Sequence, residues 1–236
     1  MSGAGWLSYS LQDFMMFGPQ VFLRLFVRIN QDVWPWSLLV VLLGFLVPLF
    51  LVSHKHGLRR LALWLISLGW MVSGYIFLVG YFGPINWPAA WFGWAFVLQG
   101  GLLGLMAVAG AADQDEQFHQ PTIGHYRPAA RGLVVCWIIA LLVLPWFPVA
   151  ESGNWQALAL FGLTPWTTAA VSMLGIAFLR GPWRWLYLLL PVLWSLFSAA
   201  TFWVLQTTWL LVLPVATLVF IGLGLWLSPR RAQSSG

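Results

Sequence analysis

The sequence predicts an all-α, polytopic membrane protein: a bundle of about seven transmembrane helices plus an N-terminal interfacial amphipathic helix. Three observations lead to this fold class. The chain of 236 residues is 61% hydrophobic and only 7% charged, whereas soluble domains carry about 25% charged residues. Seven apolar runs approach the length of about 20 residues that crosses a hydrocarbon core. Lysine and arginine follow every second run, which is the pattern of multi-spanning proteins.

The seven apolar runs form one domain over residues 36–228, followed by a short tail of residues 229–236. Pro165, Pro191 and Pro214 lie inside the last three runs, where proline frees a backbone carbonyl and is expected to kink a helix rather than break it. The expected spans are residues 36–53, 61–82, 89–110, 132–149, 157–179, 185–205 and 209–228.

The N-terminal segment, residues 1–35, differs in kind from the spans. Arg24 and Arg28 lie one turn apart, opposite an apolar face, so we expect an amphipathic helix within residues 11–30 that lies in the membrane interface. Such a helix serves either as an anchor that seats the bundle or as a lid or partner-docking element. Its apolar residues recur at helical spacing: Val21, Phe22, Leu25, Phe26 and Ile29.

The basic loops set the expected orientation. Lys or Arg residues follow the first, third, fifth and seventh spans, and the loops after the second, fourth and sixth contain none. The positive-inside rule then puts the N-terminus outside and the C-terminus in the cytoplasm. The net charge of +5 therefore reflects membrane topology, and we expect the lipid bilayer, not nucleic acid, as the partner.

Eighteen tryptophans are many for this length. Most are expected in the aromatic belts at the two membrane boundaries, where an indole ring places its N–H in the headgroup region. The rest lie deeper and either pack between helices or line a cavity. Those near span ends are Trp34, Trp36, Trp87, Trp91, Trp146, Trp155, Trp183, Trp185 and Trp209. The deeper ones are Trp64, Trp70, Trp94, Trp166, Trp194 and Trp203.

No ionisable residue falls in the middle of any span, which disfavours proton-coupled transporters, retinal proteins and haem b cytochromes. No nucleophile–base pair, phosphate loop or zinc motif is visible, so we expect neither an enzyme nor a cofactor or metal. The loop of residues 111–131 holds His119 and His125 beside three acidic residues. Their spacing matches no ligand motif, and a solvated polar loop is the favoured interpretation. The single cysteine, Cys136, is expected to be a small buried hydrophobe.

Uncharged polar side chains inside the spans are the candidate site. One interpretation is a polar-lined cavity that opens outward. The other is hydrogen bonding between helices, worth about 0.6 kcal/mol for each pair. The candidates are Gln99 in the third span, Thr164, Thr167 and Thr168 around Pro165 in the fifth, and Ser195 and Ser198 in the sixth.

Two function classes remain. The class that we favour is a small-solute permease or channel-like transporter, which requires a continuous hydrated cavity that touches Gln99, Thr167, Thr168 and Ser198. A structural or accessory subunit would bind a lipid, a membrane protein or a second copy of itself. It requires a dry core and an exposed small-residue groove near Gly100 and Gly104, which form a GxxxG pattern.

Three segments carry a family resemblance: NQDVWP at residues 30–35, INWPAAWFGWAFVLQG at residues 85–100 and FGLTPWTTAAVSMLGIAFL at residues 161–179. They resemble a bacterial family of multi-spanning membrane proteins that is a domain of unknown function. The resemblance implies the fold and a bacterial inner membrane. Members of that family carry a Pro-Cys-Pro-Thr-Thr-like segment and an upstream Gly-His pair. This chain instead has Trp166 after Pro165, and Glu151 to Asn154 upstream, so any chemistry of that cysteine and histidine would be absent.

Overall fold

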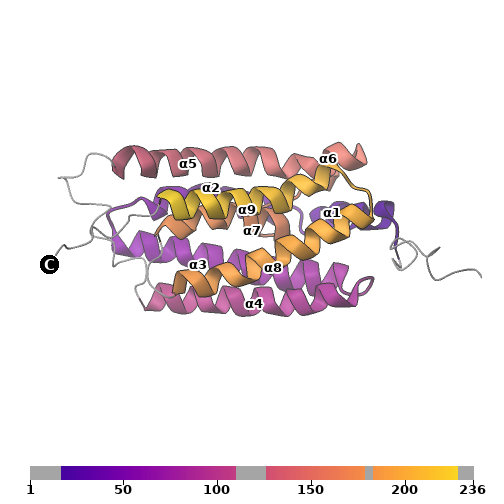
Figure 1. The fold of residues 1–236 in the computed structure, drawn as a ribbon, viewed down its shortest axis with the longest axis horizontal. Coiled ribbons are helices and arrows are strands. Elements are labelled where there is room, and N and C mark those ends of the chain that lie inside the picture. The colour runs from indigo at the N-terminus through magenta and orange to yellow at the C-terminus, as the bar shows by residue number, and fades with distance from the viewer. Residues whose placement is uncertain (1–16, 110–125, 179–182, 228–236) are drawn as a thin grey trace, which may run out of the picture.

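The computed structural model describes residues 17–109, 126–178 and 183–227, and these residues form helices and no strands. The all-α prediction is thus confirmed for them. The helices run mostly side by side along one long axis (Figure 1). They are α1 (Pro19–Asp32), α2 (Trp36–Leu51), α3 (His56–Val72) with a π-helical continuation (Ser73–Phe82), α4 (Trp87–Val108), α5 (Tyr126–Val143), α6 (Phe147–Ser152), α7 (Pro165–Met173), α8 (Trp183–Val204) and α9 (Val212–Leu227). Short helical turns lie at Leu144–Trp146, Trp155–Ala157, Leu174–Phe178 and Trp209–Leu211.

Five of the described helices are long and apolar enough to cross a membrane, or six if the bent pair α1 and α2 counts as one span. The sequence suggested about seven. Long outward faces of these helices are apolar: Leu98 is 75% exposed, Leu105 67% and Trp203 74%. Exposed apolar surface of this extent requires lipid as its solvent, in agreement with a membrane protein.

The two ends of the bundle differ in charge. The starts of α3, α5 and α8 lie at one end, and α1 lies at the other (Figure 1). Lys55, Arg59 and Arg60 begin α3, while Arg131 and Arg184 lie near the starts of α5 and α8. We call these the basic end and the α1 end. The alternation of charge read from the sequence therefore corresponds to a real separation in space.

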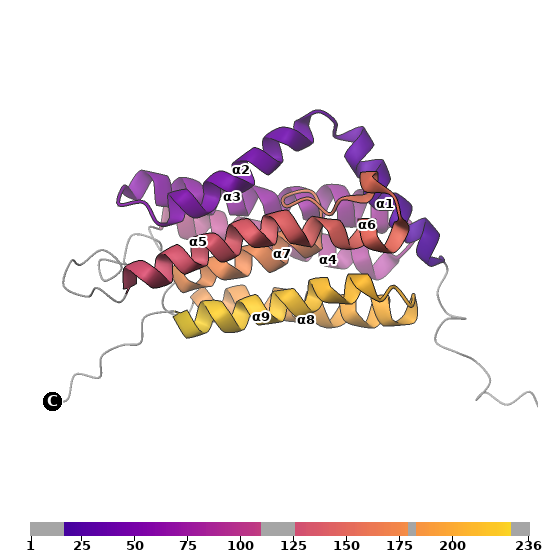
Figure 2. The same cartoon turned by 90° about the horizontal axis from the view of Figure 1, so that it is seen from above.

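Helix α1 crosses the α1 end, and the chain then turns back along the bundle as α2, with a bend of 96° between them (Figure 2). Pro19 is the first helical residue, a position where proline's missing N–H has no consequence. Phe22, Phe26 and Ile29 are each 0% exposed, so the apolar face of this amphipathic helix packs on protein. This packing favours the lid over the lipid anchor.

The fifth expected span, residues 157–179, is not a continuous helix. Residues 158–164 are non-helical, and α7 with the following turn spans only 9 and 5 residues. At about 1.5 Å per residue this is roughly 21 Å, short of a hydrocarbon core of about 30 Å. Gly162, in the left-handed region with φ of 81°, redirects the chain, and Pro165 then begins α7 as its first residue. All residues from Phe161 to Ala177 are buried.

The GxxxG pattern is used within the chain. A Cβ on Gly100 would lie 2.6 Å from the Met71 Cγ atom, and a Cβ on Gly104 would lie 3.0 Å from the Trp64 ring. The Ser67 hydroxyl donates to the Gly100 carbonyl at 2.7 Å. Both glycines thus permit close contact between α3 and α4, and the exposed groove that the accessory-subunit interpretation expected at these positions is not formed.

The tryptophans divide much as expected. Eight of those assigned to span ends are at least 55% exposed: Trp34, Trp36, Trp87, Trp91, Trp146, Trp155, Trp185 and Trp209. The side chain of Trp183 lies outside the described residues. Of the deeper set, Trp70, Trp166 and Trp194 are buried, whereas Trp64, Trp94 and Trp203 are exposed. Only the buried group bears on the interior of the bundle.

Candidate functional site

The six candidate polar residues are all buried, between 0 and 6% exposed. They lie on α4, on α8, on α7 and just before α7, and each side chain forms a hydrogen bond inside the protein. Gln99 illustrates the pattern. Pro191 has no N–H, so it leaves the Tyr187 carbonyl of α8 without its helical partner, and the Gln99 amide donates to that carbonyl at 2.8 Å. Gln99 thus repairs a proline kink.

The three threonines satisfy the backbone of the non-helical segment that leads into α7. The Thr168 hydroxyl accepts from the Gly162 N–H at 2.8 Å and donates to the Thr164 carbonyl at 2.6 Å. The Thr167 hydroxyl donates to the Ala159 carbonyl at 2.6 Å, and Thr164 donates to Leu160 at 3.0 Å. Irregular backbone at membrane depth requires such partners because no water supplies them.

The two serines on α8 have equally local roles. The Ser195 hydroxyl donates to the Pro191 carbonyl at 2.7 Å, and Ser198 accepts from the Trp166 indole N–H at 2.9 Å. Two other buried groups in this interior have no hydrogen-bond partner, the Tyr187 hydroxyl and the Trp194 indole N–H. The polar residues chosen from the sequence therefore hold backbone and tryptophan in place.

Seven aromatic rings pack together around the start of α7, and we call this cluster the aromatic cap. Its members are Phe22, Phe26, Phe77, Phe82, Trp166, Trp194 and Phe202. Trp166 is its centre, with ring centroids of the other six at 5.3 to 6.5 Å. Phe22 and Phe26 come from α1, so this helix covers the buried N-terminus of α7. The sequence marked Trp166 as a deep tryptophan and Phe22 and Phe26 as one helix face, but it did not join them.

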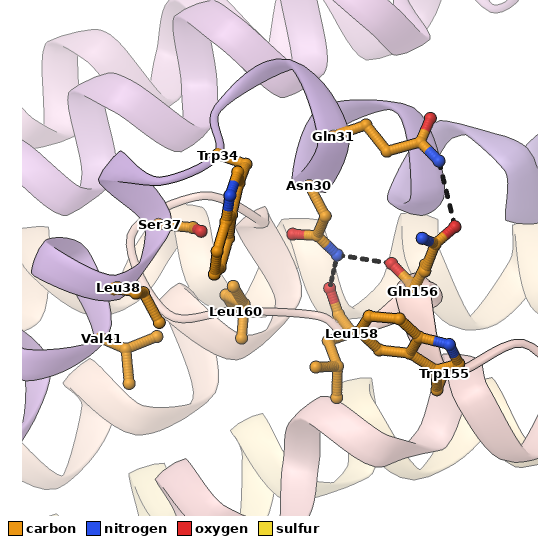
Figure 3. Close-up of a pocket in the computed structure, with 10 residues that line it drawn as sticks. All are labelled: Asn30, Gln31, Trp34, Ser37, Leu38, Val41, Trp155, Gln156, Leu158 and Leu160. Carbon is orange, nitrogen blue, oxygen red and sulfur yellow. Dashed lines mark hydrogen bonds between the residues drawn. The ribbon is translucent and has the colours of Figure 1, made fainter.

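A pocket of about 590 Å³ lies at the bend between α1 and α2. We call it the bend pocket. Its far wall is the non-helical segment that precedes α7 (Figure 3). Trp34 and Trp155, 63% and 69% exposed, belong to its lining. The lining residues are Asn30, Gln31, Trp34, Ser37, Leu38, Val41, Trp155, Gln156, Leu158 and Leu160.

Asn30 ties the bend to the opposite wall of the bend pocket. Its amide nitrogen donates to the carbonyls of Gln156 and Leu158, both at 2.8 Å. Two acceptors face this nitrogen, so the amide orientation is determined and both of its N–H groups are used. The side-chain oxygen is buried without a partner and points toward Trp34 (Figure 3). An unsatisfied buried acceptor is unfavourable by about 1–3 kcal/mol.

The acidic residues at the α1 end form hydrogen bonds and an ion pair within the protein. Asp32 accepts from the Tyr81 hydroxyl at 2.6 Å and lies 3.6 Å from Arg28. The Glu151 carboxylate accepts from the backbone N–H of Trp209 at 2.8 Å, and this hydrogen bond joins α6 to the turn before α9. Within the described part of the chain, no three His, Cys, Asp or Glu side chains gather as a metal site would require. His119, His125 and their acidic neighbours lie outside the described residues.

A family model of unknown function matches residues 19–234. The chain belongs to this family, DUF6064. The resemblance to a family without an assigned function is confirmed to that extent. The DUF6064 match begins at Pro19, the first residue of α1, so α1, the aromatic cap and the bend pocket all belong to the family domain. No curated protein and no solved structure matches the chain.

Proposed function

We propose that this protein is an accessory or structural component of a bacterial inner membrane that binds a lipid or protein partner at its α1 end. In this proposal it is neither an open solute pathway nor an enzyme. The basic end faces the cytoplasm, as the positive-inside rule predicts. The supporting observation is that Gln99, Thr164, Thr167, Thr168, Ser195 and Ser198 are buried and hydrogen-bonded inside the protein.

A polar pathway needs side chains whose hydrogen-bonding groups face water or solute. Here the Gln99 amide holds the carbonyl that Pro191 frees, and the Thr168 hydroxyl bridges two backbone groups of the turn before α7. Freeing either side chain for a solute would leave buried backbone groups unpaired, which is unfavourable by about 1–3 kcal/mol for each group. These residues are therefore better suited to maintaining a dry core.

Thiol accessibility tests the proposal. Thr167→Cys and Ser198→Cys, each in a Cys136→Ala background, are exposed in intact cells to a membrane-impermeant thiol reagent. Thr208→Cys is the matched control, because Thr208 is exposed in the turn between α8 and α9 at the α1 end. We expect rapid labelling at position 208 and far slower labelling at 167 and 198. Equal rates at all three positions would refute the dry core.

One observation favours a second candidate, a small-solute permease closed by α1. Discontinuous helices with buried N-termini form the substrate sites of many secondary transporters, and α7 begins inside the bundle beneath the aromatic cap. Phe22→Ala, added to the Thr167→Cys reporter, would open the aromatic cap and leave the other five candidate polar residues unchanged. The permease predicts a sharp increase in labelling at position 167, and the accessory role predicts little change.

A further inference from the structure

We infer that the bend pocket binds a membrane phospholipid whose headgroup donates a hydrogen bond to Asn30. The inference rests on the proposed binding role and names the ligand class of that role. It draws on three observations: the order of polar and apolar residues along the pocket, the exposed tryptophans in its lining, and the unpartnered oxygen of Asn30.

The lining changes from polar to apolar in the direction that a phospholipid does. Asn30, Gln31 and Gln156 lie at the α1 end, where Gln31 donates to the Gln156 side chain at 3.0 Å. Along α2 the lining continues with Ser37, then Leu38 and Val41. Val41 lies about 6 Å further along the helix than Ser37. A headgroup at the amides therefore places its acyl chain against leucine and valine.

The lining tryptophans place the pocket at headgroup depth. Trp34 and Trp155 are among its most exposed residues, and exposed tryptophans prefer the boundary between headgroups and hydrocarbon. The exposed side chain of Leu38, at 59%, continues the same surface toward the hydrocarbon. A volume of about 590 Å³ falls in the range of about 300–1,000 Å³ typical of small-molecule sites. The site is thus accessible from the bilayer and large enough for part of a lipid.

Asn30 supplies selectivity. Both of its N–H groups are held by backbone carbonyls, so what it offers a ligand is an acceptor, its side-chain oxygen. That oxygen is buried in this structure and points toward the Trp34 ring (Figure 3). Binding of a headgroup donor therefore requires the exposed Trp34 side chain to move. The ammonium group of phosphatidylethanolamine and the hydroxyls of phosphatidylglycerol are donors. The trimethylated ammonium of phosphatidylcholine has no N–H.

Photo-crosslinking tests the site. The purified full-length protein, in nanodiscs of defined lipid composition, is labelled with a phosphatidylethanolamine that carries a diazirine on its acyl chain. Labelled peptides are mapped by mass spectrometry in the presence of each unlabelled phospholipid as competitor. We expect labelling within residues 34–41 or 155–160. Phosphatidylethanolamine or phosphatidylglycerol should compete about tenfold better than phosphatidylcholine, the effect of one hydrogen bond of about 1.4 kcal/mol.

Two variants separate the pocket from the bulk lipid around the helix. Val41→Trp fills the pocket and should abolish the labelling. Leu42→Trp is the matched control, because Leu42 neighbours Val41 but is 57% exposed and is not part of the lining; its labelling should match wild type. Leu38→Trp replaces Val41→Trp if the latter lowers the melting temperature. Asn30→Ala should keep the labelling and equalise competition by the three lipids.

Each outcome has a defined consequence. Equal competition by all three lipids in the wild type overturns the role of Asn30, and unchanged labelling in Val41→Trp overturns the pocket. Absence of lipid labelling within residues 34–41 and 155–160 in the wild-type protein would refute the lipid as the occupant. Fast thiol labelling at Thr167 with retained lipid selectivity would refute the dry core alone. Slow thiol labelling without lipid selectivity would refute only the lipid site.

Discussion

The aromatic cap surrounds Trp166 in the first turn of α7, whereas the bend pocket is lined in part by Leu158 and Leu160 just before α7, and the two regions differ in packing. In the cap, Trp166 is surrounded by six rings and its indole N–H is bonded to Ser198, although the indole N–H of Trp194 has no partner. In the pocket, the Asn30 oxygen has no partner and Trp34 is largely exposed. Helix α1 contributes to both regions, with Phe22 and Phe26 in the cap and Asn30 and Gln31 in the pocket lining.

The comparison changes how buried polar residues are interpreted in this protein. The threonines beside Pro165 look functional in the sequence, yet they complete the hydrogen bonds of the non-helical segment before α7. Asn30 looks like part of an interfacial helix, yet it provides the unmet acceptor of the bend pocket. The binding site that we propose is therefore marked by an unsatisfied acceptor beside a pocket and not by polarity within a span.

The largest expected effect separates the two regions by stability. Trp166→Ala removes the centre of the aromatic cap and should lower the free energy of unfolding by about 3–5 kcal/mol. Trp203→Ala, at a position 74% exposed, should change it by less than about 0.5 kcal/mol. Denaturant titration of the protein in mild detergent measures both. Similar losses for the two variants would mean that the cap is not a packed core.

Thr168→Val should destabilise the protein by about 1–3 kcal/mol, because it leaves the Gly162 N–H buried without an acceptor. Thr201→Val is the matched control. The Thr201 hydroxyl bonds only to the carbonyl four residues earlier in its own helix, so its loss should have little effect. The same titration measures both variants. An unchanged free energy of unfolding in Thr168→Val would contradict the structural role assigned to this threonine.

Gly162→Ala tests the non-helical segment that leads into α7. Its left-handed φ of 81° is unfavourable for alanine by about 1–2 kcal/mol, and the new Cβ would lie 2.7 Å from the Val40 Cγ1 atom. Gly101→Ala, with nothing within 4 Å of the added Cβ, should stabilise α4 by up to about 1 kcal/mol. Opposite signs in the melting temperature are therefore expected, and equal shifts would argue against the turn at Gly162.

The smallest effect on stability is expected at the bend pocket. Val41→Trp should change the free energy of unfolding by no more than about 0.5 kcal/mol, because its added ring enters the bend pocket rather than packed core. Denaturant titration of this variant beside Thr168→Val measures the difference. A destabilisation as large as that of Thr168→Val would show that α2 and the segment before α7 are tightly packed together.

Long, uninterrupted apolar runs could be predicted well from the sequence. The expected span of residues 61–82 lies within α3 and its continuation, His56–Phe82, and the expected span of residues 89–110 corresponds to α4, Trp87–Val108. The run of residues 157–179 was apolar throughout, but apolarity does not distinguish a helix from a buried irregular segment. Pro165 alone predicts a kink in this run, and the left-handed turn at Gly162, which the sequence analysis does not identify, makes it a break.

The candidate site could be predicted less completely, because its hydrogen bonds join residues that are far apart in the sequence. Gln99 was singled out as polar, but its partner carbonyl on Tyr187 is 88 residues away and is free only because of Pro191. Asn30 was noted only within a family-like segment, and the carbonyls that orient it are 126 and 128 residues away. A single sequence contains no signal for such pairs.

The half-length helix α7 also has a consequence for how the protein is made. Residues 158–164 carry irregular backbone, which does not occur exposed to the hydrocarbon of a bilayer, and α7 alone is too short to cross one. The segment can therefore settle only among helices that are already in the membrane. Because synthesis proceeds from the N-terminus, α1 and α2, which border this segment, are made before it. Two of the helices that cover residues 158–164 are therefore synthesised before this segment.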